Sequence, residues 1–455
     1  MGNLDHLRSE GDINISDNRA AWQQRHISDE TARMLSDDAT YFLHQSLSTP
    51  CLNVLDGAHG ACITDDQGRT LLDFHGNYVH QVGFGNLEVI QAIRHQLDTL
   101  SFSTRRYTNK PAVDLARKLS ELAPGSLNRV LFAPGGALAL GMALKVARMA
   151  TGRFKTISMW DSFHGASLDA ISVGGEAIFR NNIGPLMPGT EHVPPPNPQD
   201  CPWDCKEAGT CRLKCADYVE YVLEKEGDVA AVVAETVRSS PVIPPKAYWK
   251  KIREACDRHG ALLILDEIPH ALGRTGTMFT CEQYDIVPDL LVIGKGLGGG
   301  IFPWAALIAK EELNEAVKER AIGHYTHEKN PVACAASLAA IQYIEKNDVL
   351  TSASVLGGYF LDGLKQLKQK HDLVHDVRGL GLLCGMELRD PETGQKAIDA
   401  SEKVMYRALE LGMNFKISMG NVLTLTPALV ITKAQLDQAL SILDQCLSEI
   451  GNGSN

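Results

Sequence analysis

The chain has no long apolar run. Nowhere in its 455 residues does an apolar stretch approach the roughly 18–20 residues that a helix needs to span a bilayer. The first residues, MGNLDHLRSEGDINISD, contain no apolar segment of the kind found in a secretory signal. A myristoylation signal would need Ser or Thr at position 6, where this chain has His6. We therefore expect a cytoplasmic protein that neither crosses nor is anchored to a membrane.

Positive charge is also in short supply. The 44 Lys and Arg residues are outnumbered by 55 Asp and Glu residues, which gives a formal net charge of -11. Such a balance disfavours nucleic acids and anionic membranes as partners. The 44% hydrophobic and 22% charged content is ordinary for a globular protein, so the composition favours an enzyme acting on small molecules.

No disulfide framework is expected from the cysteines. They number eleven, an odd count, in a long chain without a visible signal, which indicates thiols in a reducing compartment. Four of them cluster in CPWDCKEAGTCRLKC, namely Cys201, Cys205, Cys211 and Cys215. The pairs are separated by three residues rather than by the two of a CxxC zinc knuckle, so we predict no metal and keep a structural zinc site as the alternative.

Short, continuously apolar runs alternate with helix-like stretches in the middle of the chain. This pattern is typical of a parallel sheet covered by helices on both faces. Five runs predict strands: RVLFA (129–133), FKTISM (154–159), DVAAVVAE (228–235), GALLILDE (260–267) and DLLVIGK (289–295).

The pattern of predicted helices and strands changes along the chain, and this change divides the chain into predicted domains. Beyond about residue 320 long helices and short strands predict a smaller α+β domain. We expect an N-terminal arm with part of the small domain over 1–75, a large domain over 76–320 and the rest of the small domain over 321–455.

The predicted strands end in residues that carry chemistry. Gly135 and Gly136 follow the first strand, Glu235 and Asp266 lie at the ends of two others, and Lys295 follows the last. In open α/β sheets the ligand crevice lies outside the carboxyl ends of the strands. These residues are therefore expected to meet at one rim of the sheet.

Lys295 lies among five glycines in the stretch IGKGLGGG. A phosphate-binding Walker loop would need Ser or Thr after the lysine, where Gly296 stands. The spacing does match GxGxxG, but the residues that follow do not open a helix for a pyrophosphate. A lysine at the desolvated end of a buried strand can instead form a Schiff base, because desolvation lowers the pKa of its amine. The alternative without a functional role is an exposed lysine on a loop.

The other residues at the rim favour the Schiff base. Pyridoxal phosphate needs a lysine, a carboxylate at its pyridine nitrogen, an anion site for its phosphate and groups that cover its ring. Asp266 follows the apolar residues ALLIL, where a carboxylate requires a cationic partner such as a pyridinium. Phe163 in DSFHG offers a ring to stack, and Gly135 and Gly136 precede a predicted helix whose N-terminus suits a phosphate.

Three stretches together resemble a known family. LLILDEIPHALGRTG, PDLLVIGKGLGGGIFPWAALI and NPVACAASLA are similar to the class III pyridoxal-phosphate aminotransferases, which have fold type I. The resemblance extends from about Thr64 to Thr432 and includes RGLGLLCGMEL. It implies an α/β large domain with a mostly parallel seven-stranded sheet, pyridoxal 5'-phosphate as cofactor, and a homodimer with the cofactor site at the subunit interface.

The resemblance also implies a role for individual residues. Lys295 would carry the cofactor, Asp266 would contact the pyridine nitrogen, and Glu235 would lie near cofactor and substrate. The remaining cofactor-binding residues would be Gly135, Gly136, Ala137, Phe163, His164, Ile268 and Thr326, with Thr326 reaching the phosphate across the dimer interface. Arg378 would bind an acidic group of the substrate.

This chain departs from the usual pattern in informative places. Gly135-Gly136-Ala137 replaces a Ser-Gly-Thr loop, Pro269 and His270 replace a glutamine and its neighbour, and YTHEKNP replaces a glycine-rich segment. The last two changes resemble the lyase branch of the family, which releases ammonia from small hydroxylated aminophosphonates. We therefore expect an ammonia-lyase acting on a small aminophosphonate; the alternative is an ω-aminotransferase that passes the amino group to a keto acid.

Overall fold

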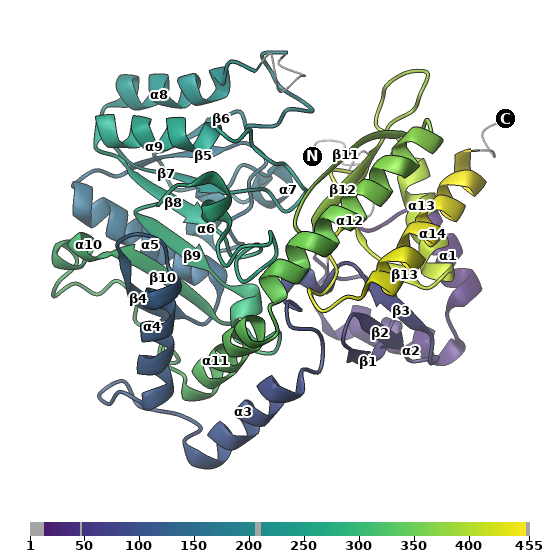
Figure 1. Ribbon diagram of the computed structural model, residues 1–455, viewed down its shortest axis with the longest axis horizontal. Coiled ribbons are helices and arrows are strands. Elements are labelled where there is room, and N and C mark those ends of the chain that lie inside the picture. The colour runs from purple at the N-terminus through teal and green to yellow at the C-terminus, as the bar shows by residue number, and fades with distance from the viewer. Residues whose placement is uncertain (1–12, 46–47, 205–210, 452–455) are drawn as a thin grey trace. The chain divides into compact units, whose positions relative to one another are not determined.

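The computed structural model describes residues 13–45, 48–204 and 211–451 and divides into two compact units. One unit is Leu87–Leu350, and the other combines the chain up to Asn86 with the chain from Thr351 onward. Figure 1 labels their helices and strands. Each unit is described by itself.

The unit Leu87–Leu350 is built on a seven-stranded sheet, as predicted (Figure 1). Neighbouring strands run parallel from β9 to β6, and β10 is antiparallel to both β9 and β4. The order across the sheet is β4 (Leu127–Ala133), β10 (Ala305–Lys310), β9 (Leu290–Ile293), β8 (Leu262–Asp266), β7 (Val229–Glu235), β5 (Lys155–Met159) and β6 (Thr190–Val193). The five predicted strands are confirmed, whereas β6 and β10 were not predicted.

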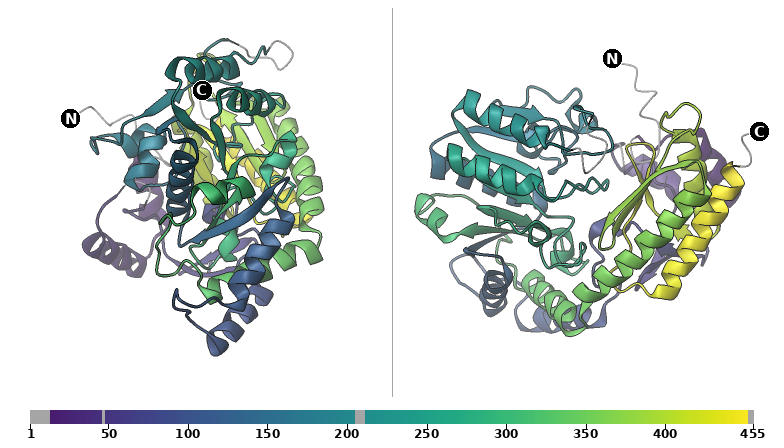
Figure 2. Two further views of the ribbon diagram at one scale, coloured as in Figure 1. Left: turned by 90° about the vertical axis from the view of Figure 1, so that its left-hand side faces the viewer. Right: turned by 45° about the horizontal axis from the view of Figure 1, so that its top comes forward.

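The central strands are apolar because both faces of the sheet are covered. Successive side chains of a strand point to opposite faces, yet Val229–Ala234 and Leu290–Ile293 are buried without interruption. Helix α5 (Gly136–Thr151) supplies much of this cover through Leu140, Ala143 and other small or apolar side chains. Helices α8 (Lys214–Glu226) and α9 (Tyr248–His259) pack against each other and against β6 and β8 respectively; the layering can be followed in Figure 2.

The rest of this unit consists of helices and loops around the sheet. Helix α11 (Pro331–Lys346) packs against α3 (Leu87–Thr99) and α4 (Lys110–Leu122), which keeps the segment after residue 320 with the large sheet. The unit boundaries therefore lie at 86/87 and 350/351, whereas the sequence suggested 75/76 and 320/321. Short helices complete the unit: α6 (Leu168–Val173), α7 (Ala177–Arg180), α10 (Glu311–Ala316) and the 3-10 turns η3 (Thr280–Tyr284) and η4 (Lys295–Gly298).

The second unit has two small sheets. In the first, N-terminal strands β1 (Leu55–His59), β2 (Cys62–Asp65) and β3 (Thr70–Asp73) are joined by β13 (Met413–Asn414), so that both ends of the chain share one sheet. The other contains β11 (Val374–Leu380), β12 (Leu383–Leu388), β15 (Val422–Leu425) and β14 (Lys416–Ser418). The helices are α1 (Asp17–His26), α2 (Asp29–Tyr41), α12 (Val349–Lys370, which begins before the boundary), α13 (Ile398–Glu410) and α14 (Lys433–Gly451).

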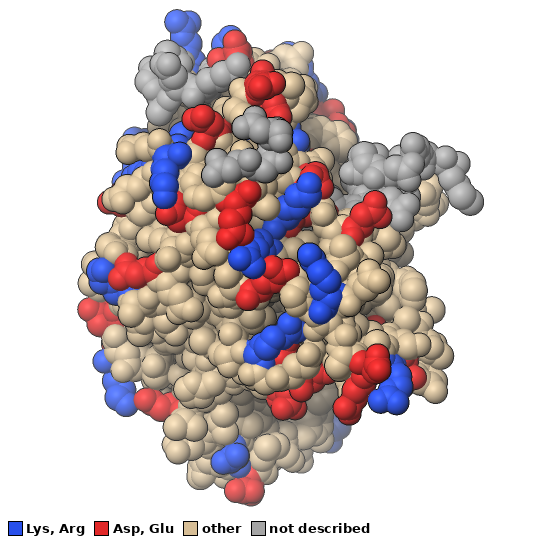
Figure 3. Space-filling model, turned by 90° about the vertical axis from the view of Figure 1, so that its right-hand side faces the viewer, with Lys and Arg blue, Asp and Glu red and all other residues tan. Residues whose placement is uncertain are grey.

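Charges of both signs are mixed on one face of the protein. On the face drawn in Figure 3, Lys and Arg side chains lie among Asp and Glu side chains. Among the described residues, no helix is long and apolar enough to cross a membrane.

Candidate active site

The predicted rim exists because three neighbouring strands end side by side. Glu235 and Asp266 are the last residues of β7 and β8 and are directly paired in the register. Asp266 is in turn paired with Val292 of β9, two residues before the loop that carries Lys295. The Glu267 N–H donates to the Val292 carbonyl at 2.8 Å and holds the loop after β8 beside the end of β9. Three predicted site residues are thus brought together by the sheet itself.

Asp266 is a buried carboxylate with two protein donors. Its side chain is almost fully buried; Oδ1 accepts from the Ile268 N–H at 3.1 Å, and Oδ2 lies 2.8 Å from Nδ1 of His164. Burial alone would lower the pKa of His164, but the hydrogen bond and the charge of Asp266 outweigh it, and the pKa of His164 is raised. The sequence suggested a cofactor pyridinium as the partner of this carboxylate, and the structure adds the imidazole of His164 on the protein side.

Glu235 lies beside this pair. Burial raises the pKa of Glu235 to about 6, against the opposing effects of the nearby charges of Arg238 and His164. Its Oε2 accepts from the Phe163 N–H at 3.4 Å. A carboxyl group with this pKa exchanges a proton near neutral pH, which suits a residue close to a reacting amine.

The start of helix α5 is shaped to leave room for a ligand. Gly135 has φ of 150°, and a Cβ built on it would meet no atom within 4 Å, so the space beside the helix N-terminus is open. A Cβ on Gly165 would lie 2.5 Å from Cβ of Ala137, so the DSFHG turn presses closely against the first turn of α5. The backbone N–H groups of a helix N-terminus are suited to a phosphate.

Ile268 packs against the backbone on two sides. A Cβ on Gly136 would approach Cδ1 of Ile268 to 2.7 Å, and a Cβ on Gly294 would approach its Cγ2 to 3.2 Å. Glycine at both positions therefore lets one side chain lie between the start of α5 and the residue before Lys295. The structure brings Gly136, Ile268 and the residue before Lys295 into one neighbourhood.

The glycines after Lys295 also have a packing role. Lys295 itself has φ of 46°, a left-handed conformation that is uncommon outside glycine and is found at functional sites. Gly299 has φ of 67°, and a Cβ there would lie 2.7 Å from Cγ1 of the buried Val89. The glycine run therefore allows the loop to turn sharply against α3.

Three further residues of the predicted site are Phe163, Thr326 and Arg378. The Phe163 ring is 38% exposed and contacts the Phe179 ring, with centroids 4.5 Å apart. Thr326 is exposed in the turn 326–329. Arg378 belongs to the other unit, on β11, where its guanidinium donates to Asp376 and Glu387 at 2.9 Å each.

Sequence reasoning gave no role to Glu267, although it follows Asp266. This buried carboxylate accepts from Oγ1 of Thr236 at 2.8 Å and from the N–H groups of Thr280 and Cys281 at 2.6 and 2.7 Å. Burial raises the pKa of Glu267 to about 7. The hydrogen bonds of Glu267 join β8 to the residue after β7 and to η3, behind the rim. In the sequence, the only indication of this role was a glutamate directly after a buried strand.

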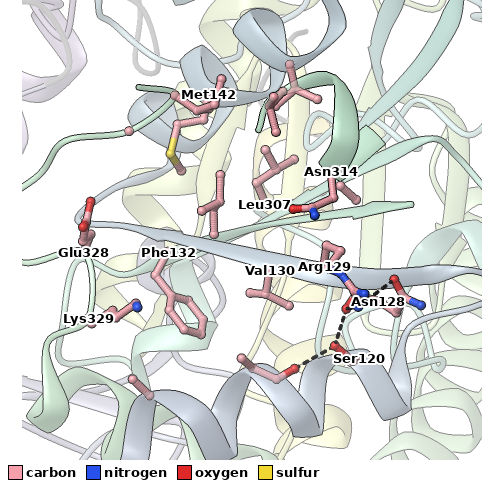
Figure 4. Close-up of a pocket in the computed structure, with 18 of the residues that line it drawn as sticks. Ser120, Asn128, Arg129, Val130, Phe132, Met142, Leu307, Asn314, Glu328 and Lys329 are labelled. Carbon is pink, nitrogen blue, oxygen red and sulfur yellow. Dashed lines mark hydrogen bonds between the residues drawn. The ribbon is translucent and has the colours of Figure 1, made fainter. Parts of the chain in front are cut away.

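A cavity of about 690 Å³ lies elsewhere in the same unit. In Figure 4, Phe132 and Val130 of β4, Leu307 of β10 and Met142 of α5 surround it, together with residues of α4 and α10. Lys295, Asp266 and Glu235 do not line it. It is therefore separate from the candidate active site.

The cysteine cluster is only partly described. Cys205 lies outside the described residues; Cys215 is buried, and Cys201 and Cys211 are partly exposed. Within the described ranges no group of three or more His, Cys, Asp or Glu side chains is placed to hold a metal ion.

The donor set fits pyridoxal phosphate. A lysine after β9 and a buried carboxylate at the end of β8, hydrogen-bonded to a histidine, lie at the ends of adjacent strands, and the uncovered N-terminus of α5 follows β4. These are the groups that the imine, the pyridine nitrogen and the phosphate require. Fold and site together define a pyridoxal-phosphate enzyme of fold type I.

The comparisons with known proteins identify the family. The sequence profile described as aminotransferase class-III matches residues 44–447, and the chain belongs to this family. It is 46% identical to the (R)-1-hydroxy-2-aminoethylphosphonate ammonia-lyase of Vibrio splendidus (strain 12B01), over 98% of this chain and 96% of that protein. It is also 35% identical to a leucine/methionine racemase of Thermococcus litoralis, over 87% and 90% of the two chains.

A solved structure matches the fold closely. An amine transaminase from an uncultivated Pseudomonas species, in its PLP-bound form, superimposes with a TM-score of 0.85 at 30% identity, covering 90% of this chain and 99% of that one. The family thus includes lyases, racemases and transaminases on one fold, and the cofactor of this chain is pyridoxal 5'-phosphate.

Proposed function

We propose that the protein is an ammonia-lyase that converts (R)-1-hydroxy-2-aminoethylphosphonate to phosphonoacetaldehyde and ammonia, a step of phosphonate catabolism. The observation that carries this proposal is the 46% identity, over nearly the full length of both chains, to a relative with that name. The departures of this chain from the usual transaminase pattern at Pro269, His270 and the YTHEKNP segment support the same assignment.

The residues at the rim would have the following roles in the reaction. Lys295 would hold the cofactor and, when displaced by the substrate amine, remove a proton from the amine-bearing carbon. Asp266, braced by His164, would hold the proton at the pyridine nitrogen. Bound pyridoxal phosphate supplies an electron sink for the carbanion.

Water loss from the neighbouring carbon distinguishes this reaction from transamination. The substrate carries a hydroxyl group next to the amine-bearing carbon, so the electron pair left by the proton can break the C–O bond. The resulting enamine becomes an imine and hydrolyses to the aldehyde and ammonia. Glu235, with its pKa of about 6, would lie near the substrate amine, and Arg378 would bind the phosphonate.

An ω-aminotransferase is the second candidate, because the solved structure with a TM-score of 0.85 is an amine transaminase. The two functions need different co-substrates. Incubation of the holoenzyme with the hydroxylated aminophosphonate alone is expected to release ammonia and phosphonoacetaldehyde in equal amounts. A requirement for pyruvate or 2-oxoglutarate, without ammonia release, would contradict the lyase assignment and support the transaminase.

We also propose a homodimer in the cytoplasm, with Thr326 and the glycines at the start of α5 at the cofactor phosphate. Exposed apolar side chains beside the 690 Å³ cavity, Val113 and Leu131, support an interface between copies. Light scattering at working concentration tests the dimer.

A further inference from the structure

Residues 324–329 form an irregular segment between α10 and α11, with Thr326 near its middle. The backbone turns sharply at this threonine, because the Glu328 N–H donates to the Tyr325 carbonyl at 3.1 Å. Thr326 itself is exposed. The segment therefore presents one hydroxyl group to its surroundings at the top of a tight turn.

Arg105, on the loop between α3 and α4, binds this segment on both sides of Thr326. Its Nε donates to Oε1 of Glu328 at 3.1 Å, and its Nη1 lies 2.9 Å from Nε2 of His324. Because the nitrogens of a guanidinium only donate, Nε2 of His324 is the acceptor. One planar group thus links the residues two positions before and two positions after Thr326, and its fixed geometry sets the direction of both bonds.

Other contacts join the same two loops. The rings of Phe102 and His327 meet edge to face, with centroids 5.3 Å apart. Nδ2 of Asn109, the buried residue that caps α4, donates to the Lys329 carbonyl at 2.9 Å. Nδ2 of Asn330 lies 3.1 Å from Nδ1 of His327. The 324–329 segment is therefore attached to the start of a helix rather than being held only by its own backbone.

The segment also borders the cavity of about 690 Å³. Glu328 and Lys329 line this cavity, and Figure 4 shows both at one end of it. Val113 and Leu131, the exposed apolar side chains that support an interface between copies, line the same cavity. Thr326 would therefore meet a second copy of the chain at this interface.

We propose that Arg105 is a positioning residue, which holds the 324–329 segment in the shape that presents the Thr326 hydroxyl to the cofactor phosphate of the partner subunit. This inference rests on the proposed function, in particular on the homodimer and on the contact between Thr326 and the phosphate. A hydroxyl on an unconstrained turn would lose conformational freedom when it binds, which weakens binding. The two bonds of Arg105 restrict the turn before the cofactor arrives.

The experiment compares pyridoxal phosphate with pyridoxal, which lacks the phosphate. Both are titrated by absorbance into cofactor-free protein. Arg105→Met should weaken the binding of pyridoxal phosphate by about 5- to 30-fold, because the loss of one or two hydrogen bonds changes an equilibrium by roughly that factor. The affinity for pyridoxal should stay within about twofold of wild type, since no phosphate is there to be held. Equal losses for both ligands, or no loss for either, overturn the proposal.

Two further variants separate position from charge. Arg106→Met, at the next residue, which is exposed and makes none of these contacts, removes the same charge and should bind both ligands as wild type does. Arg105→Lys keeps the charge without the planar fork and should bind pyridoxal phosphate nearly as weakly as Arg105→Met. Wild-type affinity in Arg105→Lys, or an equal loss in Arg106→Met, would show that charge alone is responsible and overturns the positioning role.

A double-mutant cycle tests whether Arg105 acts through Thr326. Thr326→Val removes the hydroxyl group but keeps the branched shape. Adding Arg105→Met to Thr326→Val should weaken pyridoxal phosphate binding by less than about twofold further, because the two changes remove the same contact. Additive losses overturn the inference. Unchanged affinity in Thr326→Val overturns the proposed phosphate contact together with the inference, whereas a loss in Thr326→Val without one in Arg105→Met overturns the inference alone.

Mixed dimers test the contribution of the partner. Two differently tagged chains are combined, one of which carries Lys295→Ala, so that only the other chain forms an imine with the cofactor. Arg105→Met on the Lys295→Ala chain should weaken pyridoxal phosphate binding at the remaining imine site, and Arg105→Met on the other chain should leave it unchanged. The reverse pattern, or a monomer in light scattering, overturns the inference. No step of this test uses turnover, so ammonia release decides the lyase function separately.

Discussion

Nδ1 of His164 lies 2.8 Å from Oδ2 of Asp266, and both side chains are buried. The two residues are 102 positions apart in the chain, His164 on the loop that follows β5 and Asp266 at the end of β8. This bond fixes the orientation of the carboxylate whose other oxygen accepts from the Ile268 N–H.

The His164–Asp266 bond should matter most for cofactor affinity. A hydrogen bond to a charged group contributes about 1.5–3 kcal/mol, so His164→Asn is expected to weaken pyridoxal phosphate binding by about 10- to 100-fold. Equilibrium titration of cofactor-free protein by absorbance measures this, with His259→Asn as control. An unchanged affinity for pyridoxal phosphate in His164→Asn would show that the hydrogen bond from His164 to Asp266 does not contribute to cofactor binding.

The same bond predicts a pH dependence of stability. The pKa of His164 is raised in the folded protein. Its contribution is therefore fully present below the unfolded pKa near 6.5 and is lost as the pH rises through the folded value. The difference in unfolding free energy between wild type and His164→Asn should be larger at pH 6 than at pH 9, which urea denaturation of the cofactor-free proteins can measure.

Lys295 should be required for covalent attachment of the cofactor. Borohydride treatment is expected to fix the cofactor to the wild-type chain but not to Lys295→Ala, and ammonia release should fall by at least about 1,000-fold. Lys318→Ala, at an exposed lysine that pairs with Glu315, is the matched control. Full activity in Lys295→Ala would contradict every enzymatic role proposed for this site.

Gly165→Ala tests the close packing at the start of α5. The new Cβ would lie 2.5 Å from Cβ of Ala137, and Gly165 has φ of 125°, which an alanine adopts only with strain. We expect a loss of about 2 kcal/mol or more in unfolding free energy and weaker cofactor binding. Gly358→Ala in α12, where a Cβ would meet no atom within 4 Å, should be neutral or stabilising.

Glu267 predicts a loss of stability with rising pH, in the same direction as His164. Its folded pKa of about 7 lies above the ordinary value of 4.5, so its contribution to stability is complete below pH 4.5 and is lost as the pH rises through 7. The shift corresponds to about 3 kcal/mol over this window. Glu267→Gln should flatten this part of the stability curve while lowering stability overall, because the amide cannot accept from all three donors; identical curves would contradict the assignment.

The sequence predicted strands best where both faces of the sheet are buried. β7, β8 and β9 read as continuous apolar runs because both faces of the sheet are covered, and their last residues identified Glu235, Asp266 and the loop of Lys295. β6 was missed because Thr190–Val193 is a short edge strand with polar residues, and β10 because its antiparallel direction leaves no catalytic residue at the rim.

Contacts between distant residues could not be predicted from local pattern. The bond from His164 to Asp266 depends on how the loop after β5 folds back onto the end of β8. The role of Glu267 depends on donors that lie 13 and 14 positions later and 31 positions earlier. The glycines at 136 and 294 appeared as separate loop signals. The three-dimensional structure shows that a Cβ at either position would crowd the same side chain, Ile268.

The packing of Ile268 makes three segments of the chain depend on one another. A bulkier residue at position 136 or 294 would push Ile268 out of place, and a different residue at 268 would alter the fit against both backbones. Substitutions at these three positions are therefore expected to be tolerated only in combination, so that the phosphate end and the lysine end of the cofactor site change as one unit during evolution.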